Sequence, residues 1–175
     1  AELGALAAVC DPNDQLAQLY AEQFNVGNSS FEEILANTAI EGVVLAVPAP
    51  LHAAMGIKAM NSGKHVYVEK PLAMNKVEAE TMISSADENN VQLMVGHLLQ
   101  YHPVFITVRE LVDSGELGCL SYIYSNRLSF GKVRSEEDVI WSFAPHDVAV
   151  ILRLIGQAPT EVSACGGSYL TKGIA

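Results

Sequence analysis

The residues with the clearest chemical potential lie where an apolar run stops at an acid, a base and a proline. Glu69, Lys70 and Pro71 directly follow the Val-Tyr-Val run at 66–68. Such runs predict buried parallel strands, and open α/β sheets bind ligands at the carboxyl ends of their strands. We expect the ammonium group of Lys70 to be paired there, for instance with Glu69, or to have its pKa lowered by burial. Pro71 fixes the exit of the chain, with a cis bond as one option, and so would aim Lys70; a solvated lysine at a surface strand end is the alternative.

His146 is the second candidate for chemistry, since it follows Pro145 and precedes Asp147. Proline is favoured in the first turn of a helix, so Pro145 predicts the start of a helix that reaches Ile155. The dipole at a helix N-terminus disfavours an imidazolium, which would keep His146 neutral and able to accept a proton. A lone histidine at a helix start is more often structural, but together with Lys70 the catalytic interpretation is favoured.

Asp11 stands at the end of the first predicted strand. In dinucleotide-binding units an acid at such a position bonds the ribose hydroxyls of the cofactor. No arginine follows Asp11 directly, which favours NAD over NADP as the cofactor. An Asx turn before Pro12 explains the same residue equally well.

Other polar positions fall on the loops that would border the same cleft. Pro48 and His52 follow the second predicted strand, where His52 either contacts a cofactor or caps the next helix. His97 and His102 flank Tyr101 just after the fourth predicted strand, and one of the two histidines is expected to line the cleft.

Strand and helix signals alternate along residues 5–97. The predicted strands cover 5–10, 42–47, 65–68 and 91–95, and the predicted helices cover 14–24, 30–35, 50–61 and 75–89. This alternation predicts an α/β fold with a Rossmann-type, doubly wound parallel sheet. No GxGxxG turn occurs, so either the first strand and its glycine turn lie outside these 175 residues or the protein binds no dinucleotide. Parallel strands would then be left on an exposed edge.

The pattern changes after Pro103, where part of an α+β domain with a mainly antiparallel open sheet is predicted. We expect a helix to 113, a two-faced strand at 120–130, a charged loop at 132–138 and another strand at 160–170. The chain is therefore divided into an incomplete dinucleotide-binding domain, 1–101, and an incomplete substrate-binding and oligomerisation domain, 102–175. The apolar face of 120–130 predicts association into at least a dimer, unless further elements of the same chain cover it.

Composition excludes several classes of function. A net charge of −10 argues against nucleic acid and anionic membrane surfaces as partners, and no run is long and apolar enough to span a bilayer. Cys10, Cys119 and Cys165 have long spacings that fit a reducing cytoplasm and predict no disulfide framework and no metal site. We expect them to be small buried thiols.

Five segments resemble the Gfo/Idh/MocA oxidoreductases, NAD(P)-dependent dehydrogenases of sugars, cyclitols and related polyols. They are Val-Cys-Asp at 9–11, Ala-Val-Pro-Ala-Pro-Leu-His at 46–52, Gly-Lys-His-Val-Tyr-Val-Glu-Lys-Pro-Leu-Ala at 63–73, Val-Gly-His-Leu-Leu-Gln-Tyr-His-Pro at 95–103 and Pro-His-Asp at 145–147. The segment at 63–73 is specific, and the others follow the family's order and spacing. Many members carry an aspartate where this chain has Ser142 and an arginine where it has Gln100. The stretch 141–147 is similar to the nucleotide-sugar branch.

The resemblance implies hydride transfer between a nicotinamide and a sugar or nucleotide-sugar hydroxyl or ketone. It implies catalytic roles for Lys70 and His146, with a homo-oligomer, a dimer or tetramer, as the assembly. The implied cofactor contacts are Asp11, Pro48, His52, Glu69, Lys70 and Pro71. The implied substrate contacts are Lys70, Tyr101, Ser142, His146 and Asp147. A non-catalytic sugar-responsive or scaffolding relative that lacks the glycine turn is the alternative, and a full enzyme with further residues at both ends is the interpretation we favour.

Overall fold

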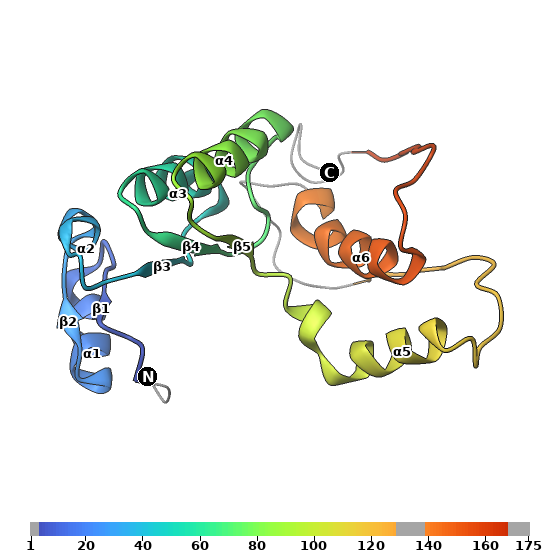
Figure 1. The fold of residues 1–175 in the computed structure, drawn as a ribbon, viewed down its shortest axis with the longest axis horizontal. Helices are drawn as coiled ribbons and strands as arrows, with labels where there is room; N and C mark the ends of the chain where they lie inside the picture. The colour runs from blue at the N-terminus through green and yellow to red at the C-terminus, as the bar shows by residue number, and fades with distance from the viewer. Residues whose placement is uncertain (1–3, 129–138, 168–175) are drawn as a thin grey trace.

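The fold is taken from a computed structural model that describes residues 4–128 and 139–167 (Figure 1). Its strands are β1 (Ala8–Val9), β2 (Gly27–Asn28), β3 (Gly42–Leu45), β4 (His65–Val68) and β5 (Leu93–Val95). Its α-helices are α1 (Asp14–Phe24), α2 (Phe31–Ala36), α3 (His52–Asn61), α4 (Lys76–Glu88), α5 (Pro103–Asp113) and α6 (Val139–Ile155), with short 3₁₀ helices η1 (Ala49–Leu51) and η2 (Leu98–Tyr101). Strands and helices alternate up to β5, as the sequence predicts.

The strands form two parallel sheets rather than one. β1 pairs with β2, and β4 lies between β3 and β5, with Val44 opposite Tyr67 and Tyr67 opposite Met94. Within the described residues β1 and β3 each pair along one edge alone, which confirms the expectation of an exposed parallel edge. The side chain of Val44, in the middle of β3, is 70% exposed, because it points to the opposite face from Val43 and Leu45, which pack in the core.

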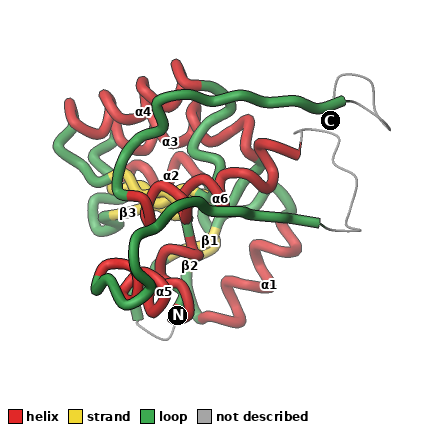
Figure 2. Tube along the Cα trace, turned by 90° about the vertical axis from the view of Figure 1, so that its right-hand side faces the viewer, coloured by secondary structure: helices red, strands yellow, loops and turns green. Residues whose placement is uncertain are grey.

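Helices α3 and α4 cover one face of the three-stranded sheet, and both views agree on this (Figures 1 and 2). The core between them contains Met60, Met82 and Val68, none of which has any exposed surface. Full burial of such side chains stabilises a fold by about 1.5–3 kcal/mol each. Gly56 permits the close approach of the two helices, since a Cβ at this position would lie 2.7 Å from Cε of Met82.

Local capping signals explain where the helices begin. Asn13 accepts hydrogen bonds from the backbone of α1, Asn75 does the same for α4, and Ser30 with Glu33 forms the predicted capping box of α2. The Glu33 carboxylate accepts hydrogen bonds from the backbone N–H and the hydroxyl of Ser30, and these bonds lower its pKa. Gly63 follows α3 with a positive φ of 75°, as expected of a residue just past a helix C-terminus.

Several predictions about burial are wrong. All three cysteines are exposed, because Cys10 follows the short open strand β1 and the other two lie on segments that no sheet covers. The larger apolar side chains of α1 are also exposed, with Leu19 at 55%, and the helix buries Ala17 and Ala21. In α5 Phe105 is buried, whereas Val108 is 37% exposed.

The two long strands predicted after α5 are wrong for the residues that the structure describes. Residues 120–128 and 160–167 run as irregular segments, drawn as loops in Figure 2, because no described strand lies beside them to complete a ladder. Residues 129–130 and 168–170, and the charged loop predicted at 132–138, lie outside the described ranges. The apolar side chains of Tyr122 and Leu128 are more than four-fifths exposed, at 83% and 84%.

Candidate active site

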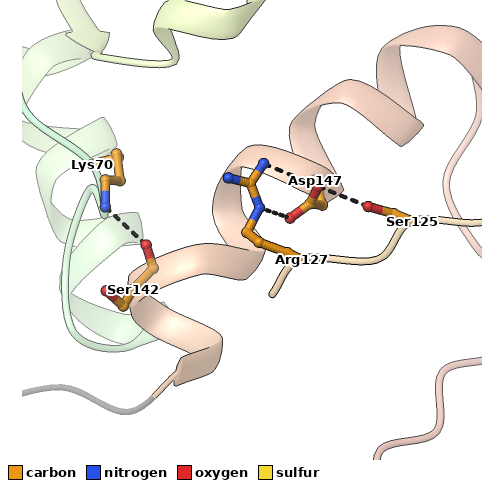
Figure 3. A network of polar contacts seen from close by, with 5 residues as sticks. All are labelled: Lys70, Ser125, Arg127, Ser142 and Asp147. Atoms are coloured by element: carbon orange, nitrogen blue, oxygen red, sulfur yellow. Dashed lines mark hydrogen bonds and ion pairs between the residues drawn. The ribbon is translucent and has the colours of Figure 1, made fainter. Parts of the chain in front are cut away.

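Lys70 lies just beyond the carboxyl end of β4 and joins the two parts of the chain. Its Nζ atom donates a hydrogen bond of 2.9 Å to the backbone oxygen of Ser142 in α6 (Figure 3). The bond between Lys70 and Pro71 is cis, which confirms the option stated from the sequence. No ion pair joins Lys70 to Glu69 among the described residues, so the half-buried ammonium group is partnered by a carbonyl rather than by its neighbour.

His52 fastens the two loops that border this position. Its side chain is buried, with 1% exposed, and its Nδ1 atom lies 2.7 Å from the backbone oxygen of Pro71. Its Nε2 atom lies 2.9 Å from the backbone oxygen of Val47. His52 therefore connects the loop after β3 to the loop that carries Lys70. A neutral imidazole has one N–H, so it donates to one of these two carbonyls.

Helix α6 brings His146 into the same region, although not as predicted. The helix begins at Val139, so Pro145 lies inside it and His146 is not at its N-terminus. The prediction that the helix dipole keeps His146 neutral is therefore wrong in its cause. Gln100 holds the same helix from the other side, since its Nε2 atom donates to the backbone oxygen of Ala149 at 2.7 Å. Ser142 and His146 are one helical turn apart, which brings the His146 backbone close to the carbonyl that Lys70 contacts.

Burial and charge favour the neutral form of His146. Desolvation is the largest cause that lowers the pKa of His146, and the positive charges of Lys70, Arg127 and His97 lower it further. The carboxylate of Asp147 acts in the opposite direction and raises it. Burial also lowers the pKa of His97. The neutral imidazole expected from the sequence is thus favoured by desolvation and neighbouring cations instead of a helix dipole.

Three polar atoms near Lys70 are buried without a partner in the described structure. They are Oγ of Ser142, Nδ1 of His146 and Nδ1 of His97. Buried polar atoms almost always have hydrogen-bond partners, so these atoms are candidate contacts for a polar ligand. His97 also lines an open hollow of about 680 Å³ with Gln100 and Tyr101, and Tyr101 is itself 63% exposed.

Asp147 belongs to a polar cluster that the sequence did not reveal. Arg127 Nε donates to its Oδ2 at 2.7 Å, Arg127 Nη2 donates to its Oδ1 at 3.2 Å, and Ser125 Oγ donates to its Oδ1 at 2.9 Å (Figure 3). The hydrogen bond from Arg127 is the largest cause that lowers the pKa of Asp147. The period-two alternation of this segment offered one signal, because Ser125 and Arg127 share the face opposite its apolar residues.

The remaining predicted cofactor residues, Asp11, Pro48 and Glu69, differ in their surroundings. Asp11 is exposed, and its Oδ1 atom accepts a hydrogen bond of 2.8 Å from the backbone of Asn13, as in the Asx turn that was the alternative interpretation. Pro48 is exposed at the start of η1. Glu69 is half-buried and lies against Gly96, where a Cβ atom would come within 3.2 Å of its Oε2. The cofactor-binding roles of these residues stay predictions.

Comparisons with known proteins agree with this fold. The family described as "Oxidoreductase family, NAD-binding Rossmann fold" matches residues 1–97. The UDP-N-acetylglucosamine 3-dehydrogenase of Acidithiobacillus ferrooxidans is 31% identical over 173 residues, covering 98% of this chain and 53% of that protein. The chain thus spans about half the length of the curated relatives it matches.

Solved structures share the architecture. A candidate myo-inositol dehydrogenase from Sinorhizobium meliloti has a TM-score of 0.75 at 20% identity, covering 88% of this chain and 48% of its own, and supports the fold alone. A 3-ketoreductase from Actinomadura kijaniata, in complex with TDP-benzene and NADP, has a TM-score of 0.59 at 28% identity, covering 63% and 35%. The first part of the chain is therefore an NAD(P)-binding Rossmann fold. The chain belongs to the Gfo/Idh/MocA oxidoreductase family.

None of the helices in the described residues is long and apolar enough to cross a membrane.

Proposed function

We propose that the protein is an NAD(P)-dependent oxidoreductase that transfers hydride between a nicotinamide cofactor and a hydroxyl or ketone of a sugar or nucleotide sugar. One observation supports this most strongly. The amine of Lys70, from the strand–helix part of the chain, bonds to the carbonyl of Ser142, one turn before His146 on α6. A cation and a neutral imidazole from two distant segments thus lie close together, as the reduction or oxidation of an alcohol requires.

Residues 1–101 would bind the dinucleotide and residues 102–175 would supply the substrate side. The names of relatives support the substrate class, since they include a UDP-N-acetylglucosamine 3-dehydrogenase and a 3-ketoreductase solved with TDP-benzene. We favour NAD over NADP, because Asp11 lies two positions after β1 with no arginine next to it to neutralise a 2′-phosphate. A cytoplasmic homo-oligomer, a dimer or tetramer, is the expected form, without nucleic acid or membrane as a partner.

Each side chain has a definite task in this mechanism. The nicotinamide ring, when bound, supplies the site that accepts or gives the hydride. The ammonium group of Lys70 binds and orients the reacting hydroxyl and stabilises negative charge on its oxygen. A ring nitrogen of neutral His146 takes the hydroxyl proton during oxidation and returns it during reduction. Ser142 Oγ and Nδ1 of His97 are buried without partners, and they would hold neighbouring hydroxyls of the sugar.

Substitution of the two central residues tests the proposal. In the full chain, Lys70→Ala should lower turnover of a UDP-sugar by roughly 10²–10³-fold, by loss of a preorganised cation. His146→Gln should lower it by roughly 10²–10⁴-fold, by loss of the acid–base group. Lys76→Ala removes an exposed lysine and His65→Gln a histidine at the opposite end of β4, so both serve as matched controls.

The cofactor's absorbance measures the rate, and circular dichroism verifies that each variant is folded. Full activity in either Lys70→Ala or His146→Gln would refute the role of that residue. Absence of NAD and NADP binding by the full chain would favour the non-catalytic alternative.

A further inference from the structure

Arg127 is the least expected member of the cluster around His146. It reaches Asp147 from the irregular segment before α6. Its Nε atom donates to Oδ2 of that carboxylate at 2.7 Å, and its Nη2 atom donates to Oδ1 at 3.2 Å. A bidentate guanidinium–carboxylate pair is geometrically specific, because the planar fork matches the two oxygens. Ser125 adds a third hydrogen bond to the same carboxylate. Figure 3 shows Arg127 and Ser125 approaching Asp147 from this segment.

The pair matters for His146 because Asp147 is its direct neighbour on α6. Among the described residues, the groups that act on the charge of His146 come from four places: Asp147 on α6, Arg127 on the preceding segment, Lys70 after β4 and His97 after β5. Of these, the Asp147 carboxylate alone favours the imidazolium. Arg127 opposes it twice, once by its own positive charge and once by neutralising the carboxylate.

We propose that Arg127 is a positioning residue of the site. It binds both oxygens of the Asp147 carboxylate and so limits the stabilisation that this carboxylate gives to a proton on His146. The same contact attaches the segment at 119–128 to the helix turn that carries His146. This inference rests on the proposed function, since a neutral His146 is what the proton transfer needs. It explains how a carboxylate can lie beside a base without making the base a permanent cation.

Two substitutions separate this role from simple structural support. Arg127→Gln removes a cation and leaves the carboxylate unneutralised, so the pKa of His146 should rise. Asp147→Asn removes the carboxylate and leaves the guanidinium unneutralised, so the pKa of His146 should fall. Both substitutions break the same ion pair. If the pair had a purely structural role, the two substitutions should change the pKa of His146 in the same direction. We expect changes in opposite directions.

The measurement is an NMR titration of the histidine ring resonances of the full chain, with the His146 signal assigned by its loss in His146→Gln. Arg127→Lys retains the positive charge but loses the planar guanidinium group, so it should change the pKa of His146 less than Arg127→Gln does. Lys58→Gln removes a cation from the exposed pair with Glu32 on another part of the molecule, and it should leave the His146 signal unchanged. If Arg127→Gln and Asp147→Asn changed the pKa of His146 in the same direction, or left it unchanged, the positioning role of Arg127 would be overturned.

Turnover of the same variants provides the second readout. The acid limb of the pH–rate profile should move to higher pH in Arg127→Gln and to lower pH in Asp147→Asn. A wild-type chain without hydride transfer would refute the proposed function but would leave the titration interpretable. A wild-type chain that transfers hydride, with an acid limb that neither variant moves, would refute the role of Arg127 alone.

Discussion

Lys70 and Ser142 are 72 positions apart in the sequence, and their hydrogen bond places the amine beside the helix that carries His146. Several groups around this cluster are held in place by hydrogen bonds. His52 contacts the carbonyls that flank the Lys70 loop, Gln100 holds α6, and Arg127 holds Asp147. Rigid support of this kind keeps reacting groups in a productive geometry, which accounts for much of enzymatic rate acceleration.

The charge on His146 leads to a prediction about pH. Burial and three neighbouring cations lower its pKa, so the ring stays neutral to a lower pH than an ordinary histidine with a pKa of about 6.5. Because a general base must be neutral, oxidation of the alcohol should be lost as the pH falls through this lowered value. A profile of kcat/KM against pH for the wild-type chain measures it. An acid limb above the ordinary histidine value would contradict the prediction.

His52 leads to a prediction about stability and activity together. His52→Ala removes the one hydrogen bond that the neutral imidazole donates to these carbonyls and leaves its acceptor unpaired, which should cost about 1–3 kcal/mol in the free energy of unfolding. Turnover should fall as well, because the Lys70 loop loses its attachment to Val47. Urea unfolding and a rate assay measure the two effects, with His65→Ala as the matched exposed histidine. Unchanged stability in His52→Ala would show that the contacts of His52 with Pro71 and Val47 do not stabilise the fold.

At the scale of helices and strands, local signals predicted the boundaries well and long-range pairing poorly. The bounds 14–24 of α1 and 65–68 of β4 agree with the prediction, because a cap or a glycine marks them in the sequence. β2 was missed, since Gly27 and Asn28 carry no apolar period. The start of α6 was wrong, because a proline that is common in a first turn here lies within the helix.

The N-cap of α4 can be tested directly. Asn75 Oδ1 accepts a hydrogen bond of 3.0 Å from the backbone N–H of Glu78 at the start of the helix that buries Met82. Asn75→Ala should therefore lower the free energy of unfolding by about 1 kcal/mol, whereas Asn75→Asp retains an acceptor and should change it little. Chemical denaturation of both variants gives the comparison. An equal loss in the two variants would argue against capping as the cause.

Across the whole molecule, the sequence singled out Lys70 and His146 as candidates for chemistry but did not reveal every partner that the residues around them find. Lys70 and His146 were recognisable because each stands beside a proline at the end or start of a predicted element. Arg127 was not, because its partner Asp147 lies 20 positions away and the segment between them was expected to form a strand and a charged loop. The exposure of Val44 and of all three cysteines likewise depends on which segments cover them in the fold, which local patterns do not encode.

The proposed preference for NAD belongs to the scale of the whole protein, because it rests on Asp11 near β1 rather than on the site around Lys70. The full chain should bind NAD more tightly than NADP, since the carboxylate of Asp11 would repel a 2′-phosphate. Asp11→Ser should reduce the difference in affinity between NAD and NADP, because it removes the carboxylate that would repel the 2′-phosphate. Isothermal titration calorimetry with both cofactors measures it, with Asp14→Ser on α1 as the control. Tighter binding of NADP by the wild-type chain would contradict the assignment of NAD.

Transfer of a label to the sugar tests the central claim most directly. The full chain is incubated with a 3-keto nucleotide sugar and a reduced cofactor that carries deuterium on the nicotinamide, and the sugar product is examined by mass spectrometry. We predict one deuterium on the carbinol carbon for the wild-type chain, and a strongly reduced yield for Lys70→Ala and for His146→Gln. Product without deuterium, or equal labelling by all three proteins, would contradict hydride transfer at this cluster.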